Sequence, residues 1–73
     1  MNSQQEGLKL SNDKAIIDLE ILNESPLSWQ GFDGDNKVNL PKSEVAILDD
    51  AWTMGDCVEV EIPVWLALKL KLI

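Results

Sequence analysis

The chain has 73 residues and a formal net charge of −7, with 13 Asp and Glu against 6 Lys and Arg. This length allows one small domain with a thin core, and a hydrophobic fraction of 45% is typical of a globular protein rather than a disordered chain. The acidic balance disfavours direct binding to nucleic acid, which requires clustered cations, and docking on anionic membranes. Histidine is absent and Cys57 is the only cysteine, which excludes a histidine-dependent triad, an intramolecular disulfide and the usual zinc ligand sets.

The beginning of the chain is polar and has no periodic apolar pattern, so we expect 1–13 to be a flexible terminus and 14–73 to form the single domain. No basic stretch followed by an apolar one indicates a secretory signal. The apolar C-terminal stretch is too short to cross a bilayer. These features predict a soluble, intracellular protein.

Alternating apolar and polar residues at the start of the domain predict a strand over 14–22, because successive side chains of a strand point to opposite faces. Its apolar face is predicted to consist of Ile17, Leu19 and Ile21. After a break at Pro26, a second strand is expected over 27–32, with Leu27 and Trp29 on one face. The first half of the domain is therefore predicted to be β structure.

A run of turn-forming residues, Asp33–Asn36, follows the second strand and precedes a third strand expected over 37–40. Gly34 can take a positive φ, and Asp and Asn tolerate this conformation, so the run is predicted to close a hairpin. The run also resembles the start of a calcium loop. The residues that follow do not maintain the ligand spacing of such a loop, which favours the turn.

The C-terminal part is predicted to be a strand over 57–62 followed by a helix over 64–73. Pro63 suits the start of a helix, where its missing N–H costs nothing. Trp65 is expected to pack on the sheet. Because the helix is apolar almost all round, part of its surface is expected to form an interface between copies of the chain. The predicted interface residues are Val64, Leu66, Leu68, Leu70 and Ile73.

Together these elements predict a mostly β domain of four or five antiparallel strands, arranged as a small sheet or partial barrel and closed by the short C-terminal helix. No residue pattern indicates catalysis, and the adjacent Asp49 and Asp50 are expected to be solvated. Cys57 is expected to be a partly buried, unreactive thiol. We therefore predict no catalytic residue, no metal site and no cofactor.

Two features of the sequence indicate a surface for a protein partner. Trp52 lies in a turn-rich segment, and tryptophan is enriched at interface hot spots. Carboxylates alternate with the apolar residues of two predicted strands, so they are expected on the outer faces, where they would attract a basic surface. The predicted partner-binding carboxylates are Asp18, Glu20, Glu59 and Glu61.

The segments LPKSEV at 40–45, VEV at 58–60 and IPVWLA at 62–67 resemble motifs of a family of small, uncharacterised phage and prophage proteins. Proteins of that family have a Leu-Pro-Lys-Ser turn, a further strand and a C-terminal helix that begins with a Pro-x-Trp-Leu-Ala motif. The likeness covers 14–73. It implies an origin in a mobile element and an accessory role, and it supplies no catalytic residue.

The chain departs from this family at two places. Asn39 stands where an aromatic residue is usual, and Leu68 and Leu70 stand where the family helix is acidic. The segment 58–67 is also similar to part of the small β-rich domain of GINS replication subunits, whose helical domain has no counterpart in this sequence.

These observations predict a non-enzymatic, phage-encoded accessory protein, located in the host cytoplasm, that binds and inhibits a host defence component such as a CRISPR effector. An acidic protein can compete with nucleic acid for a basic groove. We expect a homo-oligomer that binds a host or phage protein and contacts neither nucleic acid nor membrane directly. The alternatives are a replication-associated interaction module and a protein that sequesters a nucleotide signal between protomers. The nucleotide-binding alternative is disfavoured, because the sequence contains no Arg, the usual ligand of phosphate groups.

Overall fold

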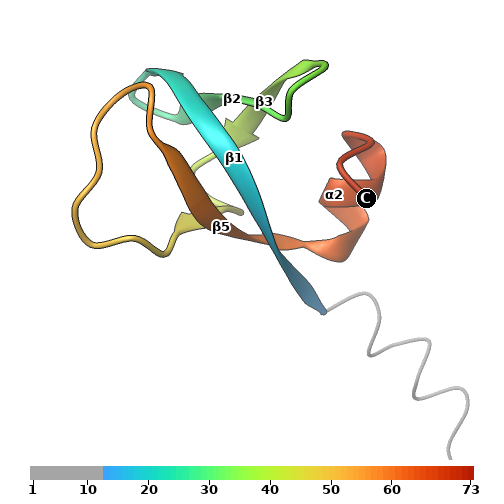
Figure 1. Cartoon of the computed structure of the whole chain (residues 1–73). Coiled ribbons are helices and arrows are strands. Elements are labelled where there is room, and N and C mark those ends of the chain that lie inside the picture. Colours follow the sequence, from blue (N-terminus) through green and yellow to red (C-terminus); the bar gives the residue numbers. More distant parts are fainter. Residues whose placement is uncertain (1–12) are drawn as a thin grey trace, which may run out of the picture.

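The computed structural model describes residues 13–73, which form one antiparallel sheet of five strands and a short C-terminal helix (Figure 1). The predicted class, a mostly β domain with a C-terminal helix, is confirmed. The predicted flexible terminus, 1–13, lies outside the described residues except for Asp13. The elements are β1 (Lys14–Glu24), β2 (Ser28–Phe32), β3 (Lys37–Pro41), β4 (Ala46–Ile47), β5 (Cys57–Pro63) and α2 (Val64–Lys69).

The strands lie in the order β3-β2-β1-β5-β4, so β1 is central and β3 and β4 are the edges. The sheet is curled but does not close into a barrel. The reason for the curl is the short connection 42–45, which joins the two edge strands. Edge strands of a flat five-stranded sheet are roughly 19 Å apart, whereas the chain from β3 to β4 extends at most about 18 Å. The Val45 N–H also donates to the Pro41 carbonyl at 3.1 Å, which shortens this connection further.

One face of the curled sheet forms the hydrophobic core, and α2 packs against this face over β5 and β1. In Figure 1, α2 lies on one side of β1 and the loop from β4 to β5 on the other. The alternation predicted for β1 and β5 is confirmed, since every second residue faces the core. Leu19, Ile21, Val58, Val60 and Ile62 are buried, and the half-buried Ile17 packs against them. The buried hydrophobic residues of the core are Leu19, Ile21, Val38, Leu40, Val45, Val58, Val60, Ile62, Leu66 and Ala67.

The turn between β1 and β2 is displaced toward the C-terminus, since β1 ends two residues later and β2 begins one residue later than the sequence suggests. β1 continues to Glu24, and the chain reverses where the Ser25 N–H donates to the Ser28 carbonyl at 2.8 Å. Leu27 lies in this turn and is 81% exposed, so its predicted place on the apolar face of a strand is wrong. Pro26 has no N–H for a sheet ladder, and it therefore favours a turn at this point.

The predicted hairpin turn at 33–36 is confirmed. The Asp33 Oδ1 atom accepts hydrogen bonds from the backbone N–H groups of Asn36 (2.7 Å) and Asp35 (2.8 Å). Gly34 has a φ of 105°, which favours glycine. The backbone hydrogen bonds from Asn36 and Asp35 also hold the pKa of the Asp33 carboxyl below its ordinary value. The loop is thus closed by the turn chemistry of its own residues.

The C-terminal helix is shorter than predicted, because it ends at Lys69 rather than continuing to Ile73. Two hydrogen bonds terminate it, from the Leu72 N–H to the Ala67 carbonyl (2.8 Å) and from the Lys71 N–H to the Leu68 carbonyl (3.1 Å). This pair of bonds is a Schellman motif, in which the residue after the cap is left-handed. Lys71 takes that conformation with a φ of 63°, and the reversal brings Leu72 against the core.

The face of α2 that meets the sheet is not the predicted one. Leu66 is 5% exposed and belongs to the core together with Ala67, so its predicted role at an interface between copies is wrong. Trp65 is 46% exposed and Leu68 is 58% exposed, so the expected packing of Trp65 on the sheet is also wrong. An apolar helix carries no polar face that could orient it. The path of the chain out of β5 therefore decides which side is buried.

Candidate functional site

The exposed side of β1 and β5 carries all four carboxylates that the sequence assigns to partner binding. Residues directly opposite each other on antiparallel strands share a face and lie about 4.5–5.5 Å apart. Three successive pairs of opposite residues on β1 and β5 face outward, and each pair contains at least one carboxylate. These pairs are Ile16–Glu61, Asp18–Glu59 and Glu20–Cys57. We call the group Asp18, Glu20, Glu59 and Glu61 the acidic face.

The acidic face is not neutralised within residues 13–73. The ion pair found in that range joins Lys42 to Glu24, and no lysine of the range bridges to a carboxylate of the acidic face. Asp18 and Glu59 are exposed, and Glu20 and Glu61 are half-buried. Like charges directly opposite each other destabilise a sheet. The arrangement therefore concentrates negative potential on one surface and lowers the stability of the central strand pair.

Cys57 lies on the same surface, opposite Glu20, and it is exposed rather than partly buried as predicted. As the first residue of β5 it shares the outward direction of Glu59, which explains the difference. Within the described part of the chain, no group of three or more Cys, His, Asp or Glu side chains is arranged to hold a metal ion. This side of β1 and β5 thus carries an exposed thiol beside the carboxylates of the acidic face.

Trp52 lies away from the acidic face, in the loop between β4 and β5. Its ring is half-buried and packs against the hydrophobic core. The loop is attached to β1, because the Gly55 N–H donates to the Ile21 carbonyl (2.7 Å) and the Ile21 N–H donates to the Asp56 carbonyl (3.0 Å). Part of the Trp52 ring therefore stabilises the fold. The structure does not bring Trp52 together with the carboxylates of the acidic face.

The residues predicted for an interface between copies are divided by the structure. Leu68 and Ile73 are exposed, at 58% and 54%, whereas Val64 and Leu70 are half-buried and Leu66 lies in the core. Trp65 precedes Leu68 by three positions and therefore lies on the same side of the helix. We call Trp65 and Leu68 the helix patch. No helix within 13–73 has the length and apolar character needed to cross a membrane.

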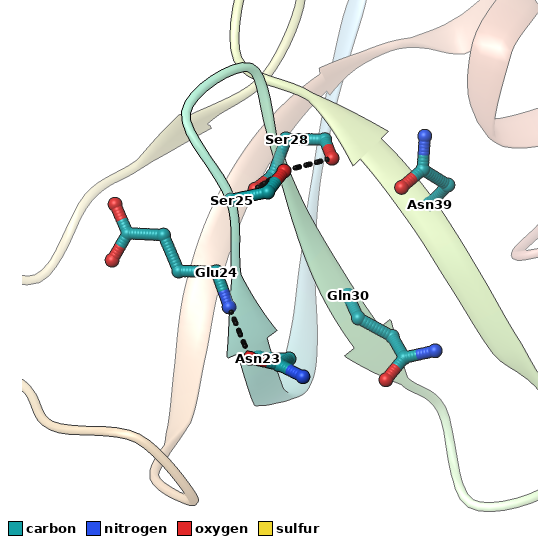
Figure 2. A pocket seen from close by; sticks show the side chains of 6 residues that line it. All are labelled: Asn23, Glu24, Ser25, Ser28, Gln30 and Asn39. Atoms are coloured by element: carbon teal, nitrogen blue, oxygen red, sulfur yellow. Dashed lines mark hydrogen bonds between the residues drawn. The ribbon is translucent and has the colours of Figure 1, made fainter.

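A polar pocket of about 230 Å³ lies where β1, β2 and β3 meet, and no sequence motif indicates it. Figure 2 shows the Gln30 and Asn39 carboxamides and the Ser28 hydroxyl on the same side of the β2–β3 hairpin. Every lining residue has a polar side chain. The lining residues are Asn23, Glu24, Ser25, Ser28, Gln30 and Asn39.

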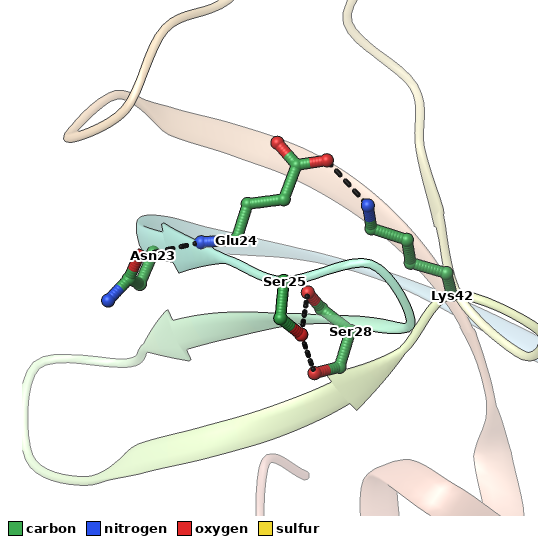
Figure 3. A network of polar contacts seen from close by, with 5 residues as sticks. All are labelled: Asn23, Glu24, Ser25, Ser28 and Lys42. Carbon is green, nitrogen blue, oxygen red and sulfur yellow. Dashed lines mark hydrogen bonds and ion pairs between the residues drawn. The ribbon is translucent and has the colours of Figure 1, made fainter.

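A small polar network closes the end of the sheet beside this pocket (Figure 3). The Lys42 ammonium donates to the Glu24 carboxylate and lies 5.2 Å from the centre of the Trp29 ring. The hydroxyls of Ser25 and Ser28 are 2.9 Å apart and share a hydrogen bond. Because no cation lines the pocket, it offers no charged partner for the phosphates of a nucleotide, the ligand of one alternative hypothesis.

Comparison of the chain with protein families, with curated proteins and with solved structures finds no match. The resemblances to the phage family and to GINS subunits therefore stay predictions from the sequence motifs.

Proposed function

We propose that this chain is a non-enzymatic binding protein whose acidic face attaches to a basic surface of a partner protein. The observation that supports this most directly is the opposition of Asp18 and Glu59 in the centre of the sheet, with Glu20 and Glu61 beside them. Such repulsion lowers stability. Natural proteins keep locally unfavourable arrangements mainly at functional sites, which supports a role for the acidic face in binding.

A basic groove is the surface that best complements this charge. Complementary potentials raise the rate of association and exclude partners of the same charge. The resemblance to small phage proteins supports a narrower form of the proposal, in which the partner is a host defence component in the host cytoplasm. A CRISPR effector is one such component, since it holds its nucleic acids in a positively charged channel. The acidic face would then compete with nucleic acid for the channel.

Two copies of the chain are proposed to associate through the helix patch. Trp65 and Leu68 expose large apolar surfaces on one side of α2, and such surfaces often mark an interface. A two-fold dimer is the commonest closed arrangement for such a contact. The helix patch and the acidic face are separate groups of residues, so a dimer could present two acidic faces at once.

The test of partner binding compares two double variants with the same change in net charge. In one variant Glu59 and Glu61 are both replaced by Lys. In the control Asp49 and Asp50, which are exposed in the loop after β4, are both replaced by Lys. Partners captured from host extract on the immobilised wild-type chain are identified by mass spectrometry, and affinity for the purified partner is then measured over a series of salt concentrations.

We expect the acidic-face variant to lose affinity and most of its salt dependence, because screened attraction is what the carboxylates supply. The control variant should keep both its affinity for the partner and the salt dependence of that affinity. Equal losses in the two variants would mean that only net charge matters, and an unchanged affinity of the acidic-face variant would refute the proposal.

A further inference from the structure

Three carboxamide side chains form a row across adjacent strands at one end of the sheet. Asn23 of β1 lies opposite Gln30 of β2, and Gln30 lies opposite Asn39 of β3. Neighbouring strands are about 4.8 Å apart, so successive amide groups of the row can contact one small molecule. Ser28 precedes Gln30 by two positions and therefore belongs to the same face. This row and the Ser28 hydroxyl form the wall of the polar pocket (Figure 2).

The row depends on a β-bulge in β1. Ile21 lies opposite Gly31 and faces the core, so regular alternation would turn Asn23 toward the core as well. The register shifts between Ile21 and Asn23, which leaves Leu22 as an extra residue and brings Asn23 opposite Gln30. Bulges commonly redirect side chains next to functional sites. Here the bulge is what completes the amide row.

The amide row has hydrogen-bonding capacity that residues 13–73 leave unused. Each carboxamide has two N–H donors and a carbonyl acceptor. The Asn23 carbonyl accepts the Glu24 N–H at 2.9 Å, whereas the side chains of Gln30 and Asn39 make no hydrogen bond to any residue of that range. The row therefore presents both donors and acceptors to a ligand.

The pocket is also electrically neutral. The Glu24 carboxylate is paired with Lys42, and Figure 2 shows it directed away from Asn23, Gln30 and Asn39. A phosphate or carboxylate group would find no cation among the lining residues, and an ammonium group would find no unpaired carboxylate. The lining also contains no apolar or aromatic side chain, which disfavours a flat hydrophobic ring. Of these classes of ligand, the pocket therefore best fits a neutral molecule that is rich in hydrogen-bonding groups.

From this geometry we propose that the polar pocket binds a neutral polyhydroxyl compound of the size of one sugar ring. A hydroxyl group both donates and accepts hydrogen bonds, so neighbouring hydroxyls can satisfy the N–H and carbonyl groups of successive carboxamides. The volume of about 230 Å³ is smaller than the roughly 300 Å³ at the lower end of pockets for drug-sized ligands, which fits a single ring. This binding activity is separate from partner binding, since none of the lining residues belongs to the acidic face.

The test is an NMR titration of the full-length, isotope-labelled chain with a panel of neutral hexoses and N-acetylhexosamines. We expect at least one sugar to cause saturable shifts of the side-chain NH2 signals of Asn23, Gln30 and Asn39. The backbone signals of Glu59 and Glu61 should remain in place. The absence of saturable shifts for every sugar in the panel would overturn the proposal, as would tighter binding of a sugar phosphate than of the parent sugar.

Variants connect the shifts to the amide row. Gln30→Leu keeps the approximate size of the side chain and removes its hydrogen bonds, and we expect it to weaken sugar binding by about tenfold. Asn39→Ala, at an exposed position of an edge strand, provides a second variant with little risk to the fold. Asn36→Ala removes a carboxamide from the neighbouring turn and should bind as the wild type does. Equal affinities for Asn39→Ala and Asn36→Ala would overturn the assignment.

Discussion

Asp18 on β1 lies directly opposite Glu59 on β5, on the exposed side of the two strands that form the centre of the sheet. The inward residues of this strand pair favour the fold, since their side chains form part of the core. The outward pair opposes it through charge repulsion. Under the proposed function, stability and partner binding place opposite demands on Glu59, and both can be measured at this position.

Replacing Glu59 by Lys is expected to stabilise the protein while it weakens binding to the proposed basic partner. The substitution exchanges a repulsive cross-strand pair for an attractive one, which contributes about 0.2–1 kcal/mol. Urea unfolding measures the first effect and titration of the partner the second. The control is Glu44→Lys, which makes the same charge change in the exposed turn before β4 and should change neither quantity appreciably. A loss of stability in Glu59→Lys would contradict this interpretation of the strand pair.

Self-association through the helix patch predicts that Leu68→Glu yields a monomer. Burial of a leucine side chain contributes about 1.5–3 kcal/mol, and a carboxylate at that place would have to be desolvated. Sedimentation equilibrium should give twice the monomer mass for the wild type and the monomer mass for the variant. Ser43→Glu adds the same charge at an exposed turn and should remain dimeric. A monomeric wild-type chain at high micromolar concentration would exclude the dimer.

Gly31 is predicted to disfavour even the smallest side chain. A Cβ atom at this position would lie 2.9 Å from Leu40 Cδ1 and 3.5 Å from Leu19 Cδ1, and both leucines are buried. Overpacking of about 1–3 kcal/mol exceeds the gain of about 0.4–1 kcal/mol from a less flexible unfolded chain. Gly31→Ala should therefore destabilise the protein by about 1 kcal/mol in urea unfolding.

A double-mutant cycle with Leu40→Val identifies the cause of this loss. Shortening the side chain at position 40 gives the new methyl group room, so the cost of the double variant should be smaller than the sum of the two single costs. Strictly additive costs would show that the contact between position 31 and Leu40 is not responsible.

Lys71→Gly is expected to stabilise the protein by about 0.5–1 kcal/mol, because Lys71 holds a left-handed conformation that glycine adopts without steric cost. Thermal unfolding measures the change. Lys69→Gly is the matched control, since it also removes a lysine near the C-terminus but changes a residue with helical conformation, where glycine costs about 1 kcal/mol. The two variants should thus shift the unfolding temperature in opposite directions.

The turn at 33–36 predicts a pH-dependent effect on stability. The pKa of the Asp33 carboxyl is lowered by the backbone N–H bonds of Asn36 and Asp35. The ionised form therefore favours the folded state. This contribution is fully present above the ordinary Asp pKa of about 3.9 and is lost as the pH falls through the lowered pKa.

Asp33→Ala should accordingly be less stable than the wild type at neutral pH, and the difference should shrink in strongly acidic solution. Urea midpoints over a pH series measure it. The Asp35→Ala variant lacks a carboxylate whose side chain makes no hydrogen bond to residues 13–73, so its difference from the wild type should vary less with pH. A constant difference for Asp33→Ala across the series would refute the role of its charge.

Much of the fold is determined by local sequence. Two-residue alternation is sufficient to identify β1 and β5 and to select their core residues, such as Leu19 and Val60, because side chains of a strand must point to opposite faces. The turn at 33–36 is likewise local, since Asp33 and Gly34 supply its hydrogen bonds and its positive φ. Each carboxylate of the acidic face is also predictable as an outward residue of its own strand.

The tertiary structure alone decided how these parts meet. Asp18 and Glu59 are distant in sequence, and only the pairing of β1 with β5 sets them opposite each other. The bulge that turns Asn23 toward Gln30 depends on the register with β2, which local alternation does not specify. The first five residues of α2 are all apolar and give the helix no polar side to orient it. The direction in which the chain leaves β5 therefore determines that Leu66, rather than Trp65, is buried.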